Sequence, residues 1–150
     1  MCMWTHKGIK MIKVFIDGAC EPINPGGTAS YGMVVYRDDK KIFTRSAVVG
    51  TGDKFTNNVA EYCGLLEFLR LWHGIDPAIV YSDSQLVINQ MTGKWRVNSG
   101  LYVDYCLKCR DLIKGKPITF EWIPREKNGI ADALSKKILT DKGIRSKEWK

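Results

Sequence analysis

Four acidic residues, far apart along the chain, are the side chains most able to do chemistry together. They are Asp17, Glu61, Asp83 and Asp132. Clustered carboxylates repel one another and raise each other's pKa unless a cation neutralises them. Hard oxygen ligands favour Mg²⁺ or Mn²⁺, and two such ions would offset the four charges. If the fold brings these side chains together, they predict a divalent-metal site.

Three of these acids also have a purely structural interpretation. Glu61 could complete a capping box with Asn58 at the start of a helix. Asp83 and Asp132 could each cap the helix that follows or stabilise its first turn through the helix dipole. Asp17 has no such role, because an acid at the end of an apolar strand adds nothing to packing. The positions of these acids in the sequence do not distinguish a metal site from the structural roles.

Three strands are expected to position the first acid. Alternating apolar residues predict a strand that Asp17 closes, and turn-forming residues separate it from two further strands. Consecutive strands with short connections should form an antiparallel meander. The expected strands span 12–17, 29–37 and 41–49.

Helices and two more strands should position the other acids. Apolar spacing of three and four residues predicts a long helix that begins near Thr56, Asn57 or Asn58 and ends before Gly74. The remaining elements are a strand over 78–82, helices over 84–91 and 101–114, a strand over 118–123 and a helix over 130–139. This order predicts an α/β fold with a five-stranded mixed sheet, three strands antiparallel and then two parallel, and helices on both faces. In such sheets ligands gather at the carboxyl ends of the parallel strands, where Asp17 and Asp83 are expected.

The positive charge lies at the two ends of the chain. The 150 residues carry a net charge of +7, residues 1–13 contain three lysines and no acid, and residues 136–150 contain six basic and two acidic residues. Basic arms are typical of proteins that bind polyanions, although they also serve as solvated tails. The length fits one domain. We expect a basic extension over 1–11, the domain over 12–139 and a basic tail over 140–150.

The cysteines and the hydropathy pattern indicate the cellular setting. Five dispersed cysteines, an odd number, argue against a secreted disulfide framework. No apolar run is long enough for a signal peptide or a membrane span. Cys106 and Cys109 lie on the apolar face of a predicted helix and are expected to be core residues. A cytoplasmic protein without a membrane partner is expected.

Four sequence motifs, in this order along the chain, resemble those of a known family. They are FIDGACEPINPGG at 15–27, TNNVAEY at 56–62, YSDSQLVINQM at 81–91 and EWIPREKNGIADALSK at 121–136. Over 12–139 the chain resembles the type 1 ribonucleases H, which implies their ribonuclease H-like fold. The resemblance also implies hydrolysis of the RNA strand of RNA/DNA hybrids with two divalent ions, Mg²⁺ or Mn²⁺, leaving 5′-phosphate and 3′-hydroxyl ends.

The same resemblance assigns roles to individual residues. It makes Asp17, Glu61, Asp83 and Asp132 both the catalytic residues and the metal ligands. It places Gly18, Asn24, Asn57 and Gln85 against the hybrid, where RNA is read through its 2′-hydroxyls. The expected partner is an RNA/DNA hybrid, with duplex RNA as a further candidate, and the expected state is a monomer.

Two departures from the family qualify the prediction. Where bacterial members carry a basic helix and loop, this chain has only 92–100, with Lys94, Trp95 and Arg96. Where many relatives have a histidine, the loop 124–129 has none, and Arg125 is the candidate substitute, holding a phosphate. The alternative function is a catalytically weak nucleic-acid-binding module with the same fold.

Overall fold

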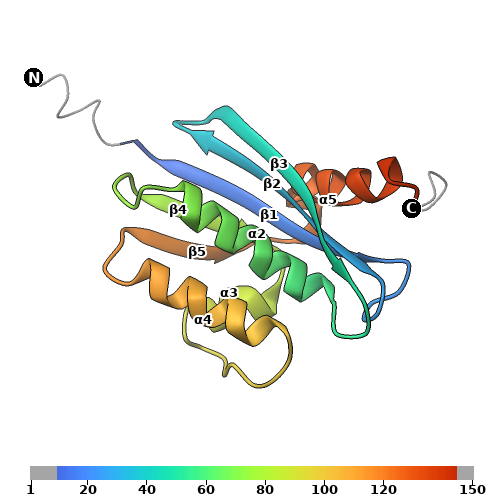
Figure 1. The fold of residues 1–150 in the computed structure, drawn as a ribbon. Helices are drawn as coiled ribbons and strands as arrows, with labels where there is room; N and C mark the ends of the chain where they lie inside the picture. The colour runs from blue at the N-terminus through green and yellow to red at the C-terminus, as the bar shows by residue number, and fades with distance from the viewer. Residues whose placement is uncertain (1–9, 145–150) are drawn as a thin grey trace, which may run out of the picture.

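The computed structural model describes residues 10–144, and the ends of the two basic arms lie outside the described residues (Figure 1). The order of elements is the predicted one, with a short 3₁₀ helix added before the last helix. The strands are β1 (Ile12–Glu21), β2 (Thr28–Arg37), β3 (Lys40–Thr51), β4 (Ala78–Ser82) and β5 (Ile118–Trp122). The helices are α2 (Asn57–Leu71), α3 (Gln85–Met91), α4 (Tyr102–Ile113), η1 (Arg125–Lys127) and α5 (Gly129–Asp141).

The five strands form one mixed sheet in the order β3-β2-β1-β4-β5. β1 pairs antiparallel with β2, which pairs antiparallel with β3. β4 is parallel to both β1 and β5, because α2 carries one crossover and α3 with α4 the other. The predicted mixed sheet is therefore confirmed.

The first strand is longer than the sequence predicts, and Asp17 lies inside it rather than at its end. β1 continues to Glu21 because Gly18 through Glu21 keep pairing with β2. Its parallel pairing with β4 stops earlier, at Phe15 opposite Tyr81. Asp17 therefore lies beyond the parallel part of β1, although the strand itself goes on. Asp17 therefore does lie at the carboxyl end of the parallel pairing, as predicted, but not at the end of the strand.

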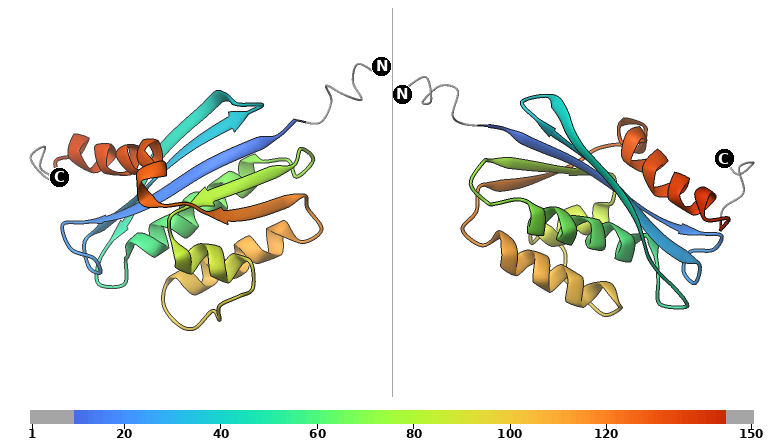
Figure 2. Two further views of the ribbon diagram at one scale, coloured as in Figure 1. Left: turned by 180° about the vertical axis from the view of Figure 1, so that it is seen from behind. Right: turned by 45° about the horizontal axis from the view of Figure 1, so that its top comes forward.

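Helices cover both faces of the sheet, as predicted (Figure 2). α2 packs on one face against β1 and β2, while α5 packs on the opposite face against β1, β2 and β3. Two glycines permit the close approach. A Cβ atom on Gly18 would lie 2.7 Å from the backbone nitrogen of Glu61, and one on Gly32 would lie 2.6 Å from that of Ser135. These contacts fix the start of α2 and the first half of α5 against the middle of the sheet.

The core lies between α2 and the sheet. Val14, Ile16 and Met33 from the strands meet Tyr62 and Leu65 from α2, and all five are essentially inaccessible to solvent. Burial of such side chains provides most of the stability of a domain this size. The predicted core cysteines of α4, Cys106 and Cys109, are buried free thiols. Within residues 10–144, no helix has the length and hydropathy needed to cross a membrane.

Candidate active site

A polar cavity of about 480 Å³ opens beside the end of the parallel strands. It is walled by the start of α2, the start of α3, the last residue of β5 and η1. Its lining residues are Asp17, Gly18, Asn57, Asn58, Glu61, Asp83, Ser84, Gln85, Leu86, Trp122 and Arg125. Three of the four predicted acids and four of the five predicted substrate contacts thus lie around one cavity.

Asp17, Glu61 and Asp83 form the centre of the site. One carboxylate oxygen from each residue lies within 4.8 Å of the others. The sheet explains part of this: Asp17 and Asp83 each come two residues after the last parallel pair, Phe15 and Tyr81. Glu61 joins them from α2, because Gly18 lets that helix contact β1. Asp17 comes from β1, Glu61 from α2 and Asp83 from the connection between β4 and α3, so the fold itself creates the cluster.

The capping interpretations of Glu61 and Asp83 are wrong. The N-cap of α2 is Thr56, whose Oγ1 accepts a hydrogen bond from the Val59 amide, and Glu61 takes no part in it. The N-cap of α3 is Ser84, whose Oγ accepts from the Val87 amide. Because both caps are supplied by other residues, local helix capping does not explain the two acids.

The electrostatics of the cluster match a site built for a cation. Burial, together with the nearby charges of Glu61, Asp83 and Asp132, raises the pKa of Asp17 to about 10. Burial also raises the pKa of Glu61 to about 8, although a hydrogen bond from Ser82 acts in the opposite direction. Ionisation of either carboxyl group is therefore energetically unfavourable unless a cation lies nearby.

A buried oxygen also lacks a partner. Glu61 is only 2% exposed, and its Oε2 atom accepts no hydrogen bond from any residue that the structure describes. A buried acceptor of this kind normally has a partner. A divalent cation held by Asp17, Glu61 and Asp83 would satisfy this oxygen and neutralise the charges, so the residues present fit a metal ion.

Asp132 lies next to this group but outside it. It is in the first turn of α5, and it is close enough to raise the pKa of Asp17. Its oxygens do not belong to the group of three, and its carboxylate is paired with the Lys136 ammonium at 3.1 Å. The i,i+4 spacing of the pair is the ordinary one for a helix. The predicted quartet is therefore a trio with a fourth acid beside it.

The predicted substrate contacts lie along the rim. Asn24 is tied to the start of α2, because its Nδ2 donates to Asn57 Oδ1 at 2.8 Å and its Oδ1 accepts from the Asn57 amide at 3.3 Å. Gln85 begins α3, and Arg125 begins η1. Gly18 has a packing role as well, since α2 leaves no room for a side chain there. The contacts of all five with nucleic acid stay predictions.

Sequence reasoning missed two residues that organise the site. Ser82, at the end of β4, donates from Oγ to Glu61 Oε1 at 2.6 Å and accepts from the Ser84 amide at 3.0 Å. Trp122, at the end of β5, donates from Nε1 to the Asp83 carbonyl at 3.1 Å. Both are last residues of parallel strands, and that position is the signal that could have identified them.

The fold and the acidic cluster define a ribonuclease H-like α/β domain. The reverse transcriptase-like family matches residues 15–138. The bifunctional protein Rv2228c of Mycobacterium tuberculosis is 36% identical over 115 residues, which is 75% of this chain and 31% of that protein. This chain thus spans about a third of the length of that relative.

Two solved structures are similar over nearly their whole length. RNase H1 of the archaeon Halobacterium salinarum is 30% identical, with a TM-score of 0.77, over 87% of this chain and 98% of that one. LC11-RNase H1, solved in complex with an RNA/DNA hybrid, is 30% identical with a TM-score of 0.77, over 89% and 99%. The chain belongs to the reverse transcriptase-like family, and its relatives place it with the type 1 ribonucleases H.

Proposed function

We propose that this protein is an endoribonuclease that hydrolyses the RNA strand of RNA/DNA hybrids, leaving 5′-phosphate and 3′-hydroxyl ends. The observation that carries the proposal is the buried group of Asp17, Glu61 and Asp83, whose oxygens converge within 4.8 Å at the edge of an open polar cavity. The two relatives of known structure described above are ribonucleases H, and one of them was solved with the hybrid bound.

The chain's own residues would hold divalent cations, Mg²⁺ or Mn²⁺. Asp17, Glu61 and Asp83 would supply the ligands of one ion. Asp132 would contribute to a second ion together with Asp17, which requires that it exchange its Lys136 partner for the metal. When bound, such ions lower the pKa of water and stabilise the negative charge that develops on the phosphate. Two ions per site would balance the four carboxylates.

The remaining residues orient the hybrid. The side chains of Asn24 and Asn57 are joined by a hydrogen bond, and Asn57 and Gln85 both line the cavity that contains the acids. Amide side chains can both donate to and accept from a 2′-hydroxyl, which only the RNA strand carries. Arg125 faces the same cavity and can hold a phosphate through two parallel hydrogen bonds. Strand choice then follows from the groups that RNA has and DNA lacks.

A cleavage assay with three substrates tests the proposal. The protein is incubated with an end-labelled RNA/DNA hybrid, duplex RNA or duplex DNA, each with Mg²⁺, Mn²⁺ or EDTA. We expect the hybrid RNA to be cut in the presence of a divalent ion only, and the DNA strand to stay intact. The hydroxyl and phosphate ends are then identified by polynucleotide kinase labelling before and after phosphatase treatment.

The other outcomes identify the alternatives. Tight binding of the hybrid without cleavage, in Mg²⁺ and in Mn²⁺, would support a catalytically weak binding module instead. Cleavage of duplex RNA at a similar rate would show that the DNA strand is not read. Cleavage that persists in EDTA would contradict the metal-dependent mechanism.

A further inference from the structure

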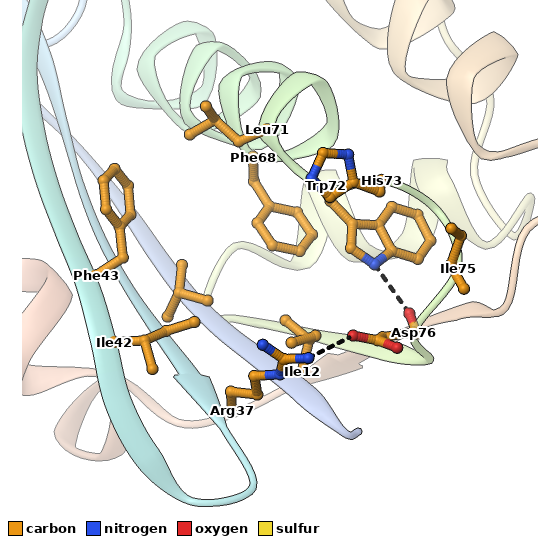
Figure 3. Close-up of a pocket in the computed structure, with 11 residues that line it drawn as sticks. Ile12, Arg37, Ile42, Phe43, Phe68, Leu71, Trp72, His73, Ile75 and Asp76 are labelled. Atoms are coloured by element: carbon orange, nitrogen blue, oxygen red, sulfur yellow. Dashed lines mark hydrogen bonds and ion pairs between the residues drawn. The ribbon is translucent and has the colours of Figure 1, made fainter. Parts of the chain in front are cut away.

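An apolar groove of about 380 Å³, which shares no lining residue with the acidic cavity, lies beside α2 and the sheet (Figure 3). It lies where β1 begins and α2 ends, between Ile12 on the sheet and the Phe68 and Trp72 rings. Four of its lining residues are large hydrophobic side chains that are substantially exposed. They are Ile42 (51%), Phe43 (37%), Leu71 (48%) and Ile75 (80%).

Three of the polar residues at the groove, Arg37, Trp72 and Asp76, interact with one another. The Arg37 guanidinium pairs with the Asp76 carboxylate at 3.5 Å, and Trp72 Nε1 donates to the Asp76 carbonyl at 2.9 Å. Both interactions are drawn in Figure 3. The walls therefore offer mainly carbon atoms to an occupant. Contiguous exposed apolar side chains of this kind commonly mark a site of interaction with another chain segment, protein or ligand.

The N-terminal part of the chain enters the fold beside this groove. Ile12, the first residue of β1, lines it. Just before Ile12, Met11 exchanges two hydrogen bonds with Asp38, from its amide to Oδ1 and from the Asp38 amide to its carbonyl, each 3.0 Å long. Lys10 also pairs with Asp38 at 3.5 Å. Asp38 lies in the turn that leads to Ile42 and Phe43, so these contacts hold the chain next to the groove wall.

Residues 1–9 precede this anchor and lie outside the described residues. Their sequence, MCMWTHKGI, contains Met1, Met3, Trp4 and Ile9, a single lysine and no acid. We propose that the groove is the docking site of residues 1–9 of this same chain, with the Trp4 side chain as its main occupant. This inference is independent of the proposed nuclease function.

Chain connectivity favours this occupant over a separate molecule. Seven residues separate Trp4 from Ile12, and a reversal of chain direction needs only a four-residue turn. A segment tethered this closely has an effective concentration of the order of millimolar, so a modest affinity suffices for occupancy. A large aromatic side chain also matches a groove lined by Phe43, Phe68 and Trp72, because aromatic rings favour one another's edges and faces.

A double-mutant cycle tests the contact in the full chain. Trp4→Ala and Leu71→Ala each remove one side of it, and Leu107→Ala serves as the matched control, because Leu107 is a leucine of similar exposure (50%) on α4. We expect Trp4→Ala to lower Tm by about 2–4 °C, the shift that corresponds to about 1 kcal/mol in a protein of this size. Combining it with Leu71→Ala should lower Tm by clearly less than the two single losses together, whereas combining it with Leu107→Ala should be additive.

Amide NMR spectra report directly whether the groove residues change their surroundings, which a measurement of stability does not. Trp4→Ala should shift the resonances of Ile42, Phe43 and Ile75, at every protein concentration, and leave the rate of hybrid hydrolysis unchanged. Shifts that appear only at high concentration, together with a dimer in sedimentation, would overturn the proposal in favour of a second copy. An unchanged Tm with unchanged groove resonances would overturn docking altogether.

Discussion

The Ser82 hydroxyl donates a 2.6 Å hydrogen bond to Glu61 Oε1, and this contact joins the end of β4 to the first half of α2. Ser82 is itself only 1% exposed, and its Oγ also accepts from the Ser84 amide. Its proton therefore points at the carboxylate, and one Glu61 oxygen is fixed while the other stays available. Residues that orient a metal ligand in this way commonly contribute to metal affinity and to activity.

We predict that Ser82→Ala weakens divalent-metal binding by about 10- to 100-fold. Without the hydroxyl, Glu61 loses the one interaction that lowers its pKa, so protons compete better with the ion. Isothermal titration of the metal-free protein with Mn²⁺ measures the affinity. Ser30→Ala is the control, because it removes a buried hydroxyl that donates to the Ser135 carbonyl at 2.6 Å. It should cost about 1 kcal/mol of stability and leave metal affinity unchanged. Equal affinities in the two variants would contradict the orienting role.

We predict that Asp17→Asn reduces hydrolysis of the hybrid by about 100-fold or more while the fold is retained. The loss of groups that merely support a metal ligand already costs 10- to 100-fold, so the loss of a central ligand should cost at least as much. Asp39→Asn is the matched control, since this aspartate is 82% exposed in the β2–β3 turn. Cleavage is measured with a labelled hybrid under single-turnover conditions. Asp17 is not a catalytic residue if the first variant cuts as fast as the second.

We predict that the metal-free protein becomes less stable as the pH rises from about 4 to about 8. The pKa values of Asp17 (about 10) and Glu61 (about 8) exceed their ordinary values of 3.8 and 4.5. Between these limits the folded state binds more protons than the unfolded state, so the free energy of unfolding falls with increasing pH. Metal ions compete with these protons, so binding should release protons and become tighter at higher pH.

Melting curves in EDTA and in excess Mg²⁺ check this dependence. The difference in Tm between wild type and Asp17→Asn isolates the aspartate, because all other groups titrate in both proteins. In EDTA, the variant should gain stability relative to wild type as the pH rises toward 8. A wild-type Tm that rises with pH relative to the variant would show that Asp17 is ionised in the metal-free fold.

We predict that Gly18→Ala destabilises the protein by about 1–3 kcal/mol and impairs catalysis. The added Cβ would lie 2.7 Å from the Glu61 backbone nitrogen, so α2 must move away from β1 and carry Glu61 with it. Gly129→Ala is the control, since a Cβ there meets nothing within 4 Å and Gly129 begins α5. Urea unfolding measures the stabilities, and Mn²⁺ titration reports the displacement of Glu61. Equal stability of the two variants would contradict the tight contact.

The amino-acid sequence was sufficient to predict the architecture and the three acids at the centre of the site. The period of two in residues 12–17 and the three- and four-residue spacing after Thr56 depend on local geometry, so they predicted a strand and a helix that the structure confirms. The motifs around Asp17, Glu61 and Asp83 identified three acids that the structure brings together.

The tertiary structure decided the features that depend on contacts between distant segments. The continuation of β1 to Glu21 follows from pairing with β2, and the partner of Glu61 comes from β4, 21 residues away in the chain. Asp132 looks equivalent to the other acids in the sequence, yet in the fold its carboxylate is paired with Lys136. Spacing along a chain reports which side chains share a face of one element. Which oxygens converge depends on how closely α2 and α5 pack on the sheet. Gly18 and Gly32 permit this close packing because they have no Cβ atom.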